Sequence, residues 1–303
     1  GSNVLIRDGG LRGLVIITNS GSKGGLCNID IVNNNQEHKL LVKAEGGVPC
    51  AKLAKFLSKN GIKGEIIIAD NGSTDGSIEI AKTHNATVVN VEEKGYGNAL
   101  KAGIEDANGK FIIIGDADDS YDFTTLMPYL IKLREGYDLV MGNRFKGGIK
   151  KGAMPFLHKY LGNPVLSFLG RLFFKSNIGD FHCGLRGLSK EAFIAMDLQT
   201  TGMEFASEMI VKASLKNMAI AEVPTILSPD GRTRPPHLNT WSDGWRHLRF
   251  LLLYSPSWLF MIPGVSLMIV GSVLSTLLII GPLDLGGITL GVHTLLYSCA
   301  AFL

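Results

Sequence analysis

Short apolar runs alternate with stretches of helical periodicity through the middle of the chain. The runs are rich in Ile and Val, end in Gly, Asp or Asn, and predict four β-strands, at residues 64–70, 86–92, 109–118 and 137–143. Apolar residues at helical spacing predict helices at 77–84, 96–107 and 123–136. This alternation is typical of an α/β fold with a mostly parallel sheet, so we expect ligands to bind at the carboxyl ends of the strands.

A long, uniformly apolar pattern fills the C-terminal part of the sequence. No charged residue occurs from Phe250 to Leu283, and residues 258–281 are long enough to cross a bilayer core of about 30 Å. A buried core helix is the alternative for this span. After a turn rich in Gly and Pro, residues 288–303 predict a second transmembrane helix that stops inside its apolar run.

The segment that precedes the first span mixes basic, aromatic and aliphatic residues. Residues 241–258 place Arg246, His247 and Arg249 beside tryptophans and a Leu run, which predicts an amphipathic helix in the lipid headgroup region. These basic residues favour the cytoplasmic side of the inner membrane by the positive-inside rule. A solvated helix packed on its own domain is the alternative.

Composition limits the class of protein. Hydrophobic residues make up 46% of the 303 residues and charged residues 19%, which excludes a disordered chain. The net charge of +3 does not indicate nucleic-acid binding. The four cysteines have neither disulfide-framework nor zinc-ligand spacing, so we interpret them as reduced thiols. We divide the chain into a first zone of short strands and one helix (1–62), a catalytic domain (63–239), a juxtamembrane helix (240–257) and two transmembrane helices, the second truncated (258–303).

An acidic pair follows the third predicted strand. Asp116 and Asp118 come directly after the apolar run 111–114, so their carboxylates are expected where the sheet opens its ligand crevice. Two carboxylates one residue apart can share Mg²⁺ or Mn²⁺, and the cation in turn binds a diphosphate. The same spacing occurs by chance in loops, and the position at a strand end is what favours a metal site here.

The end of the first predicted strand carries a second polar cluster. Asp70 is placed to accept hydrogen bonds from a base or ribose, and the backbone amides of the loop that includes Gly72 and Ser73 favour a phosphate or ribose. Capping of the next helix is a compatible alternative. The glycine-rich turn at 94–103 predicts that a helix approaches the nucleotide closely, with Lys94 as a candidate contact.

Two further candidates come from loops after the fourth strand. Arg144 directly follows this strand and is a candidate for binding phosphate, with a surface salt bridge as the alternative. Asp180 lies with His182 and Arg186 in a glycine-punctuated loop. For His182 we expect ordinary hydrogen bonding rather than metal binding, because no second metal-ligating residue is paired with it.

The last candidates precede the juxtamembrane helix. Glu204 and Glu208 lie one helical turn apart, so both carboxylates are expected on one helix face, where they could position an acceptor or tune a cation. Arg232 and Arg234 form a cationic loop that predicts binding of a lipid phosphate or of the leaving diphosphate. Contact with anionic lipid headgroups is the non-catalytic alternative for this loop.

These motifs, in this order, resemble family 2 glycosyltransferases with the GT-A fold, and more narrowly the branch related to dolichyl-phosphate mannose and glucose synthases. The resemblance covers about residues 63–260 and rests on the segments at 64–77, 115–123, 142–148, 180–187, 200–209 and 228–237. It implies a Rossmann-like domain that transfers a sugar, with inversion, from a UDP- or GDP-linked donor to a polyprenyl or dolichyl phosphate at the cytoplasmic membrane face.

The resemblance also implies roles for single residues. Asp70 contacts the nucleotide, Asp116 and Asp118 hold the metal and the diphosphate, and Arg144 meets phosphates together with the loop arginines at 232 and 234. As candidate catalytic residues we take Asp118, Arg144, Asp180 and Glu204. Whether the protein is a homo-oligomer, and which sugar and nucleobase it uses, stay open.

Residues 1–62 depart from this family. Residues 1–16 and 42–62 resemble part of the FAD-binding domain of UDP-N-acetylenolpyruvoylglucosamine reductase. We interpret this α+β segment as a fusion, natural or from gene assembly, with its junction near residues 61–64. The first strand of the GT-A sheet is then missing or replaced by a strand of this segment. The alternatives to an active glycosyltransferase are therefore a flavin-dependent reductase fragment and a catalytically inactive chimera.

Overall fold

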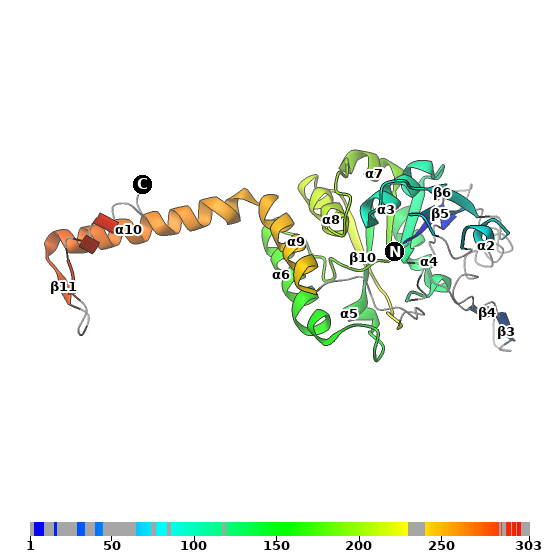
Figure 1. Cartoon of the computed structure of the whole chain (residues 1–303), viewed down its shortest axis with the longest axis horizontal. Coiled ribbons are helices and arrows are strands. Elements are labelled where there is room, and N and C mark those ends of the chain that lie inside the picture. The colour runs from blue at the N-terminus through cyan, green and yellow to red at the C-terminus, as the bar shows by residue number, and fades with distance from the viewer. Residues whose placement is uncertain are drawn as a thin grey trace. The chain divides into compact units, whose positions relative to one another are not determined.

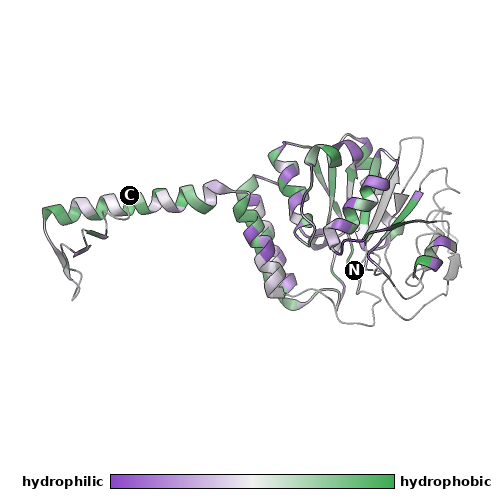
Figure 2. Cartoon of the chain, turned by 45° about the horizontal axis from the view of Figure 1, so that its top comes forward, coloured by the Kyte–Doolittle hydropathy of each residue, from purple (hydrophilic) through white to green (hydrophobic). Residues whose placement is uncertain are grey.

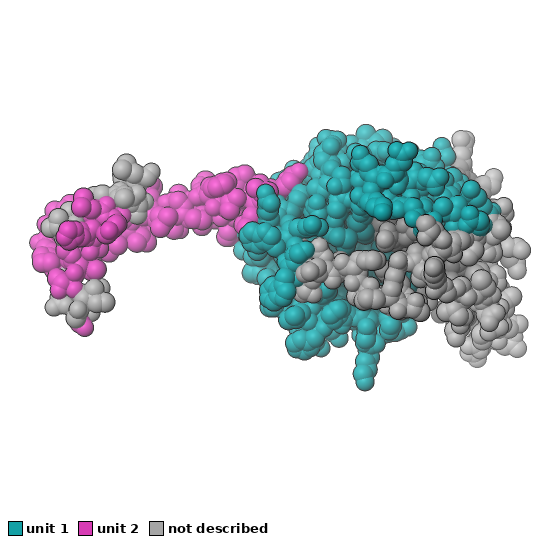
Figure 3. Space-filling model, in the orientation of Figure 1, with its two compact units in different colours: residues 1–250 teal, residues 251–303 magenta. Residues whose placement is uncertain are grey.

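The computed structural model describes residues 65–73, 77–83, 86–116, 118, 120–229 and 240–284, together with the backbone of 3–8, 15–16, 29–33 and 40–44 and of short stretches after residue 285. The chain divides into two compact units, Gly1–Phe250 and Leu251–Leu303 (Figure 3). The one helix that the sequence predicts in the first zone, at residues 49–62, lies outside the described residues.

A mixed sheet forms the centre of the first unit (Figure 1). Its strand order is β10-β8-β9-β7-β1-β5-β2, and β6 also pairs with β5. All strands of the sheet run in one direction except β1 and β9, which are antiparallel to their neighbours. The strands are β1 (Asn3–Asp8), β2 (Val15–Ile16), β5 (Glu65–Asp70), β6 (Thr87–Asn90), β7 (Phe111–Asp116), β8 (Leu139–Asn143), β9 (Arg186–Ser189) and β10 (Ile220–Pro224). The predicted α/β fold is confirmed, but the sheet is mixed rather than mostly parallel, because β1 and β9 make antiparallel pairs with the strands on both sides of them.

The strand β1 comes from the first zone and lies inside the sheet of the middle zone. It pairs with both β5 and β7, with Val4 opposite Ile68 and Asn3 opposite Asp116. Its direction is opposite to that of both neighbours. Of the two alternatives that the sequence left open for this place, a missing strand or a strand from the first zone, the structure has the second.

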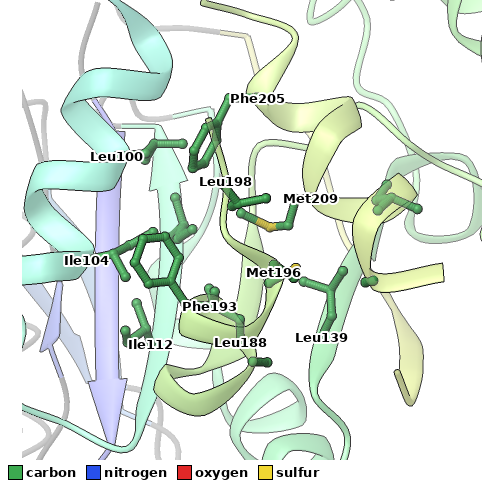
Figure 4. Close-up of a cluster of buried hydrophobic side chains, with 14 of the residues drawn as sticks. Leu100, Ile104, Ile112, Leu139, Leu188, Phe193, Met196, Leu198, Phe205 and Met209 are labelled. Atoms are coloured by element: carbon green, nitrogen blue, oxygen red, sulfur yellow. The ribbon is translucent and has the colours of Figure 1, made fainter. Parts of the chain in front are cut away.

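Apolar side chains cover both faces of the sheet. Along β5, Ile66 and Ile68 join one buried cluster, whereas Ile67 and Ala69 join another. Successive residues of a strand point to opposite faces, which explains why the run is apolar at every position rather than at alternate ones. Figure 4 shows the second cluster, where β7 and β8 meet helices α3, α7 and α8. These helices are α3 (Tyr96–Asp106), α7 (Lys190–Met196) and α8 (Phe205–Leu215).

The helices that follow β5 and β7 match their predicted positions with one difference. Helix α2 spans Ser77–Thr83, whereas the region predicted as one helix at 123–136 divides into a 3-10 turn, Phe123–Thr125, and α4, Met127–Arg134. Pro128 lies in the first turn of α4. Because proline lacks an N–H and fixes φ, it is favoured in a first turn and cannot continue a helix from upstream.

The remaining elements of the first unit follow β8 and β10. They are α5 (Arg144–Gly147), a π-helical turn at His158–Gly162 that leads into α6 (Asn163–Phe174), and α9 (Thr240–Leu253), whose last residues enter the second unit. The helix predicted in the juxtamembrane segment is thus present as α9. Apart from the sheet, β3 (Ile29–Asn33) pairs antiparallel with β4 (Leu40–Ala44).

The second unit contains a long apolar helix. A π-helical turn at Ser257–Met261 continues into α10 (Ile262–Ile280), and Figure 2 shows this helix as mostly hydrophobic. In the part of the chain that the structure describes, it is the one helix long and apolar enough to cross a membrane, and it is almost entirely exposed. Most of the second predicted span lies outside the described residues, and its Thr289–Leu290 pairs as a short strand with Leu283–Asp284.

Candidate functional site

The carboxyl ends of the parallel strands put charged residues at one edge of the sheet, as the sequence predicts. Asp70 ends β5, Asp116 ends β7, and Arg144 directly follows β8. Strand β1 lies between β5 and β7, and two interstrand spacings put those strands about 10 Å apart. This edge of the sheet therefore has an acidic residue on either side of β1.

The carboxylate of Asp70 is held by its own loop. It is 2% exposed, and its Oδ2 accepts hydrogen bonds from the backbone amides of Gly72 and Ser73, both at 2.9 Å. Gly72 adopts a positive φ of 87°, which a glycine tolerates without strain. The sequence predicted that these two amides would favour a phosphate or ribose. In the structure they stabilise Asp70 instead, because a buried carboxylate needs hydrogen-bond donors.

The acidic pair after β7 is held by two neighbouring segments. Asp116 lies so close to Gly184 that any side chain at Gly184 would collide with its carboxylate. The hydroxyl of Tyr121 accepts a hydrogen bond of 2.9 Å from the Gly184 amide. Asp118 accepts hydrogen bonds from the amide of Ser120, at 3.1 Å, and from its hydroxyl. The loop at 184 thus bounds Asp116, and Ser120 in the loop after β7 holds Asp118.

The chemistry of this pair fits a divalent cation that also binds substrate. The described residues include no group of three His, Cys, Asp or Glu side chains arranged to hold a metal by themselves. Mg²⁺ commonly takes one or two carboxylates and completes its shell with substrate phosphates and water. Asp116 and Asp118 are suited to supply the two carboxylates, so the predicted Mg²⁺ or Mn²⁺ would depend on a diphosphate for its remaining ligands.

Arg144 and Asp180 form a buried ion pair. The Asp180 carboxylate accepts bonds from Arg144 Nε at 2.7 Å, from Nη2 at 2.8 Å and from the Arg144 amide at 3.1 Å. Their side chains are 9% and 0% exposed. The alternative of a surface salt bridge is therefore wrong, since the pair is inside the protein. Phosphate binding by Arg144 stays a prediction, and the observed partner of its guanidinium is Asp180.

Glu222 on β10 anchors the loop that carries Asp180, and sequence reasoning missed it. Its Oε1 accepts hydrogen bonds from the Gly179 amide at 2.5 Å and from Asn143 Nδ2 at 2.9 Å. Its Oε2 binds Lys146 Nζ at 2.6 Å. A single acidic residue in an otherwise apolar strand is the signal that could have found it, because a carboxylate in that position needs buried partners.

The glycine-rich turn before α3 packs against the backbone of residues 200–201. The Thr201 carbonyl accepts hydrogen bonds from the amides of Gly97 at 2.8 Å and Asn98 at 3.3 Å. A side chain at Gly95 or Gly97 would collide with the backbone of the 200–201 segment. The close approach that these glycines permit within the protein is therefore to that segment, and the approach to a nucleotide stays a prediction. Lys94 is exposed.

Glu204 and Glu208 have different environments, although the sequence placed them on one face of α8. Glu208 is fully buried and accepts bonds from the Gln199 and Thr200 amides, the Thr200 hydroxyl and Lys212. Burial alone would raise the pKa of Glu208, but these hydrogen bonds outweigh it and hold the pKa below its usual value. Glu208 thus organises the 199–200 loop. Glu204 precedes α8, and its buried Oε2 has no hydrogen-bond partner.

A histidine pair joins α9 to the loop between Asp180 and Gly184. His247 Nδ1 lies 2.8 Å from the Ser207 hydroxyl, and His182 Nε2 lies 3.4 Å from the same hydroxyl. The two imidazole rings meet edge to face at 4.5 Å between centroids. The Nε2 contact agrees with the expectation of ordinary hydrogen bonding for His182, whereas its buried Nδ1 has no hydrogen-bond partner within the described protein. Arg186, nearby in sequence, is buried and donates to the carbonyls of Phe181, Cys183 and Ala206.

The stability of this unit is expected to fall in mild acid because of His182. Burial lowers the pKa of His182 well below its usual value, and the nearby His247, Arg144 and Arg186, with His158, act in the same direction. Below about pH 6.5 the unfolded chain binds a proton that the folded chain does not, so the free energy of unfolding decreases. Thermal melts should therefore show a midpoint that drops from pH 7 to pH 5.

The matched variants for this prediction are His182→Gln and His293→Gln. Removing His182 should flatten the pH dependence, whereas removing His293, which is exposed, should leave the slope of the wild-type chain. Equal slopes for wild type and His182→Gln would contradict the assignment.

The two loop arginines predicted to bind phosphate, Arg232 and Arg234, lie outside the described residues. The described candidates fall into two groups. Asp70, Asp116 and Asp118 lie at or just after strand ends, whereas Arg144 pairs with Asp180 of the loop at 179–184.

Comparison with known proteins relates this arrangement to sugar transferases. Residues 53–196 match the model of the family described as glycosyl transferase family 2. The low-salt glycan biosynthesis hexosyltransferase Agl6 of Haloferax volcanii is 41% identical over 82% of this chain and 60% of its own length. The dolichyl-phosphate hexose transferase of the same organism is 30% identical over 54% of this chain and 69% of its own length.

A solved structure supports the fold. Glucosyl-3-phosphoglycerate synthase from Mycobacterium tuberculosis, in complex with Mn²⁺, UDP-glucose and phosphoglyceric acid, superposes with a TM-score of 0.56 over 80% of this chain and 79% of that one, at 17% identity. The chain spans about 60% of the length of Agl6 and of a second relative, glycosyltransferase AglJ. The fold, the acidic strand ends and the sequence matches agree, and the chain belongs to glycosyl transferase family 2.

Proposed function

We propose that this protein transfers a hexose from a nucleotide diphosphate sugar, UDP- or GDP-linked, to a polyprenyl or dolichyl phosphate. The observation that carries the proposal is the pair Asp116 and Asp118 at the carboxyl end of β7, on the same sheet edge as Asp70. Relatives named hexosyltransferase and dolichyl-phosphate hexose transferase support the reaction class and the acceptor. A similar fold that was solved with UDP-glucose supports the donor.

The reaction requires little from the protein beyond positioning and charge stabilisation. An oxygen of the acceptor phosphate attacks the anomeric carbon, the bond from that carbon to the diphosphate oxygen breaks, and the nucleoside diphosphate leaves with the electron pair. The acceptor phosphate is already an anion near neutral pH, so no strong base is needed. A divalent cation held by Asp116 and Asp118 would supply positive charge to the departing diphosphate.

Three further roles belong to this proposal. Asp70 is proposed to contact the nucleoside, since it lies at the end of a strand that approaches the same crevice. Glu204 is proposed to face the acceptor, because it precedes the first turn of α8 and its Oε2 has no hydrogen-bond partner within the described protein. The loop arginines at 232 and 234 are proposed to bind the phosphates.

The proposed place of this reaction is the cytoplasmic face of a membrane. The helix at Ser257–Ile280 is long, apolar and almost entirely exposed, as expected for a membrane span. Arg246 and Arg249 lie on α9 just before it, and both are exposed. Basic residues next to a span favour the cytoplasmic side, and a polyprenyl phosphate acceptor would lie in the same bilayer.

A transfer assay tests this function directly. The full chain in detergent is incubated with a radiolabelled nucleotide sugar, one at a time from a UDP and GDP panel, and with polyprenyl phosphate, with or without Mn²⁺ or Mg²⁺. We expect label in the lipid phase for one donor, only when both cation and lipid are present. Absence of lipid-linked label for every donor, from a protein that binds UDP or GDP together with Mn²⁺ in calorimetry, would reject the acceptor class. Absence of nucleotide binding would reject the donor class.

A further inference from the structure

Glu222 holds the segment that carries Asp180. It lies on β10, the last strand at one edge of the sheet, and its side chain is 8% exposed. Its Oε1 accepts hydrogen bonds from two successive backbone amides, that of Gly179 at 2.5 Å and that of Asp180 at 3.3 Å. The backbone on which the Asp180 carboxylate is mounted is therefore fixed to β10 through a single oxygen atom.

The same carboxylate binds the chain on both sides of Arg144. Asn143, the last residue of β8, donates from Nδ2 to Glu222 Oε1 at 2.9 Å, and Lys146 donates from Nζ to Oε2 at 2.6 Å. The Asn143 Oδ1 in turn accepts a hydrogen bond of 2.9 Å from the Lys146 amide and so caps α5. Because a helix of one turn is not stable by itself, these contacts and the packing of α5 on β10 (Figure 1) hold the backbone of Arg144.

An ionised carboxylate suits the surroundings of Glu222. The groups that bind it are all donors: two backbone amides, a side-chain amide and an ammonium group. A carboxylate accepts at both oxygens and has no hydrogen to donate. A glutamine would keep one acceptor oxygen for the three amides, but it would turn an N–H toward the Lys146 ammonium. The acidic residue in this strand thus follows from the donors around it.

Asp180 leaves one part of the Arg144 guanidinium available. Its carboxylate binds Nε at 2.7 Å and Nη2 at 2.8 Å, which together form one edge of the planar group. A guanidinium has five N–H donors, and no described residue is a hydrogen-bond partner of Nη1. An anion that binds Arg144 would therefore bind at Nη1. The direction of Nη1 depends on Asp180, because two bonds to one edge fix the plane of the guanidinium.

We propose that Glu222 is a positioning residue for sugar transfer, which holds the end of β8, helix α5 and the loop at 179–180 so that Arg144 Nη1 points at a phosphate oxygen. Glu222 itself touches no substrate and acts through Arg144. The inference rests on the proposed function, because the phosphate belongs to the donor or to the acceptor of that reaction. It follows that the loss of Glu222 slows the reaction only while an arginine occupies position 144.

A kinetic double-variant cycle tests this dependence. The full chain is compared in detergent as wild type, Glu222→Leu, Arg144→Lys and the double variant, with polyprenyl phosphate, Mn²⁺ and the nucleotide sugar that the wild type uses. Lysine at position 144 keeps the charge beside Asp180 but cannot make the two-bond contact. We expect Glu222→Leu to lower kcat/KM by up to about 100-fold, as displacement of a substrate contact by about 1 Å can do. In the Arg144→Lys background the same change should lower kcat/KM by less than about twofold, because coupled residues do not act additively.

Further variants separate positioning from charge and from folding. Glu222→Gln keeps an acceptor for the amides and loses only the contact with Lys146, and Lys146→Met removes that contact from its exposed side. Both should stay within about fivefold of the wild type, since ion pairs with an exposed partner contribute little. Glu135→Leu, the matched control, breaks an exposed ion pair with Lys132 and should leave the rate unchanged. Where Glu222→Leu loses the circular dichroism of the wild type, Glu222→Asp, which keeps the charge on a shorter side chain, replaces it in the cycle.

Binding measurements identify the phosphate that Arg144 contacts. A higher Kd for UDP or GDP with Mn²⁺ in Glu222→Leu, measured by calorimetry, assigns the contact to the donor diphosphate. A higher KM for polyprenyl phosphate with an unchanged Kd assigns it to the acceptor. A change in neither quantity overturns the inference.

The outcomes separate the inference from the function on which it rests. Equal losses from Glu222→Leu in the wild-type and the Arg144→Lys backgrounds show that Glu222 does not act through Arg144. That result overturns the inference and leaves the proposed function intact, because the wild type still transfers sugar. A wild-type chain that transfers no sugar from any donor rejects the proposed function, and the inference with it.

Discussion

Replacing Asp116 by asparagine is expected to lower the rate of sugar transfer by about 10²–10³-fold, the usual cost of losing one electrostatic contact to the transition state. Asparagine keeps the shape of the side chain, so its fit against Gly184 should survive. The negative charge is lost, and with it part of the attraction for a divalent cation. The transfer assay with radiolabelled donor measures the rate, and a titration with Mn²⁺ should show a weaker apparent affinity.

The control for this variant is Asp106→Asn at the exposed end of α3. It removes the same charge from the same unit but lies before the start of β7 rather than at its carboxyl end, so its rate should equal that of the wild type. A rate for Asp116→Asn within twofold of wild type at low Mn²⁺ would contradict the role of this carboxylate. Unchanged circular dichroism of the variant shows that the fold is not the cause of any loss.

Replacing Arg144 by methionine is expected to lower the free energy of unfolding by about 3–5 kcal/mol, because it leaves the Asp180 carboxylate buried without its partner. Asp180 would keep the amide bonds from Arg144 and His182 but lose both guanidinium bonds. Urea unfolding of the full chain in detergent, followed by circular dichroism, measures the change.

Two further variants make this prediction specific. The double variant Arg144→Met with Asp180→Leu should recover a large part of the lost stability, since no unpaired charge then remains inside. Lys132→Met breaks an exposed ion pair with Glu135 and should leave the unfolding curve unchanged, because water screens such pairs. A double variant that is as unstable as Arg144→Met alone would show that packing rather than charge accounts for the loss.

Local patterns in the sequence determined most of the fold. The strands at 64–70 and 109–118 were recognisable because Ile occupies successive positions, which only a strand covered on both faces accommodates. Helices α2 and α3 followed from apolar residues at helical spacing. The break near Pro128 was missed because the apolar period continues through it, and only the first-turn preference of proline decides where α4 begins.

Strand β1 shows where such patterns stop being informative. Its apolar residues at 4–6 suit any buried strand, and nothing in residues 3–8 specifies the neighbour or the direction. Pairing with β5 and β7 joins segments more than 50 residues apart in the sequence. An antiparallel strand can lie between two parallel strands because parallel and antiparallel pairing both satisfy the backbone hydrogen bonds.

The sequence by itself determined which residues have the chemistry for this site. Only the tertiary structure decided which of them lie at the sheet edge and which bind one another inside the protein. Asp70, Asp116 and Asp118 were found from the sequence because residues at the ends of parallel strands must emerge at one edge of a sheet. Three arrangements were not found from the sequence. They are the pairing of Arg144 with Asp180, the anchoring of the 179–180 loop by Glu222, and the hydrogen bonds by which Glu208 holds the 199–200 loop. The physical reason is burial: a charged group inside a protein must bind whichever partner the packing brings within reach, and that partner is distant in the sequence.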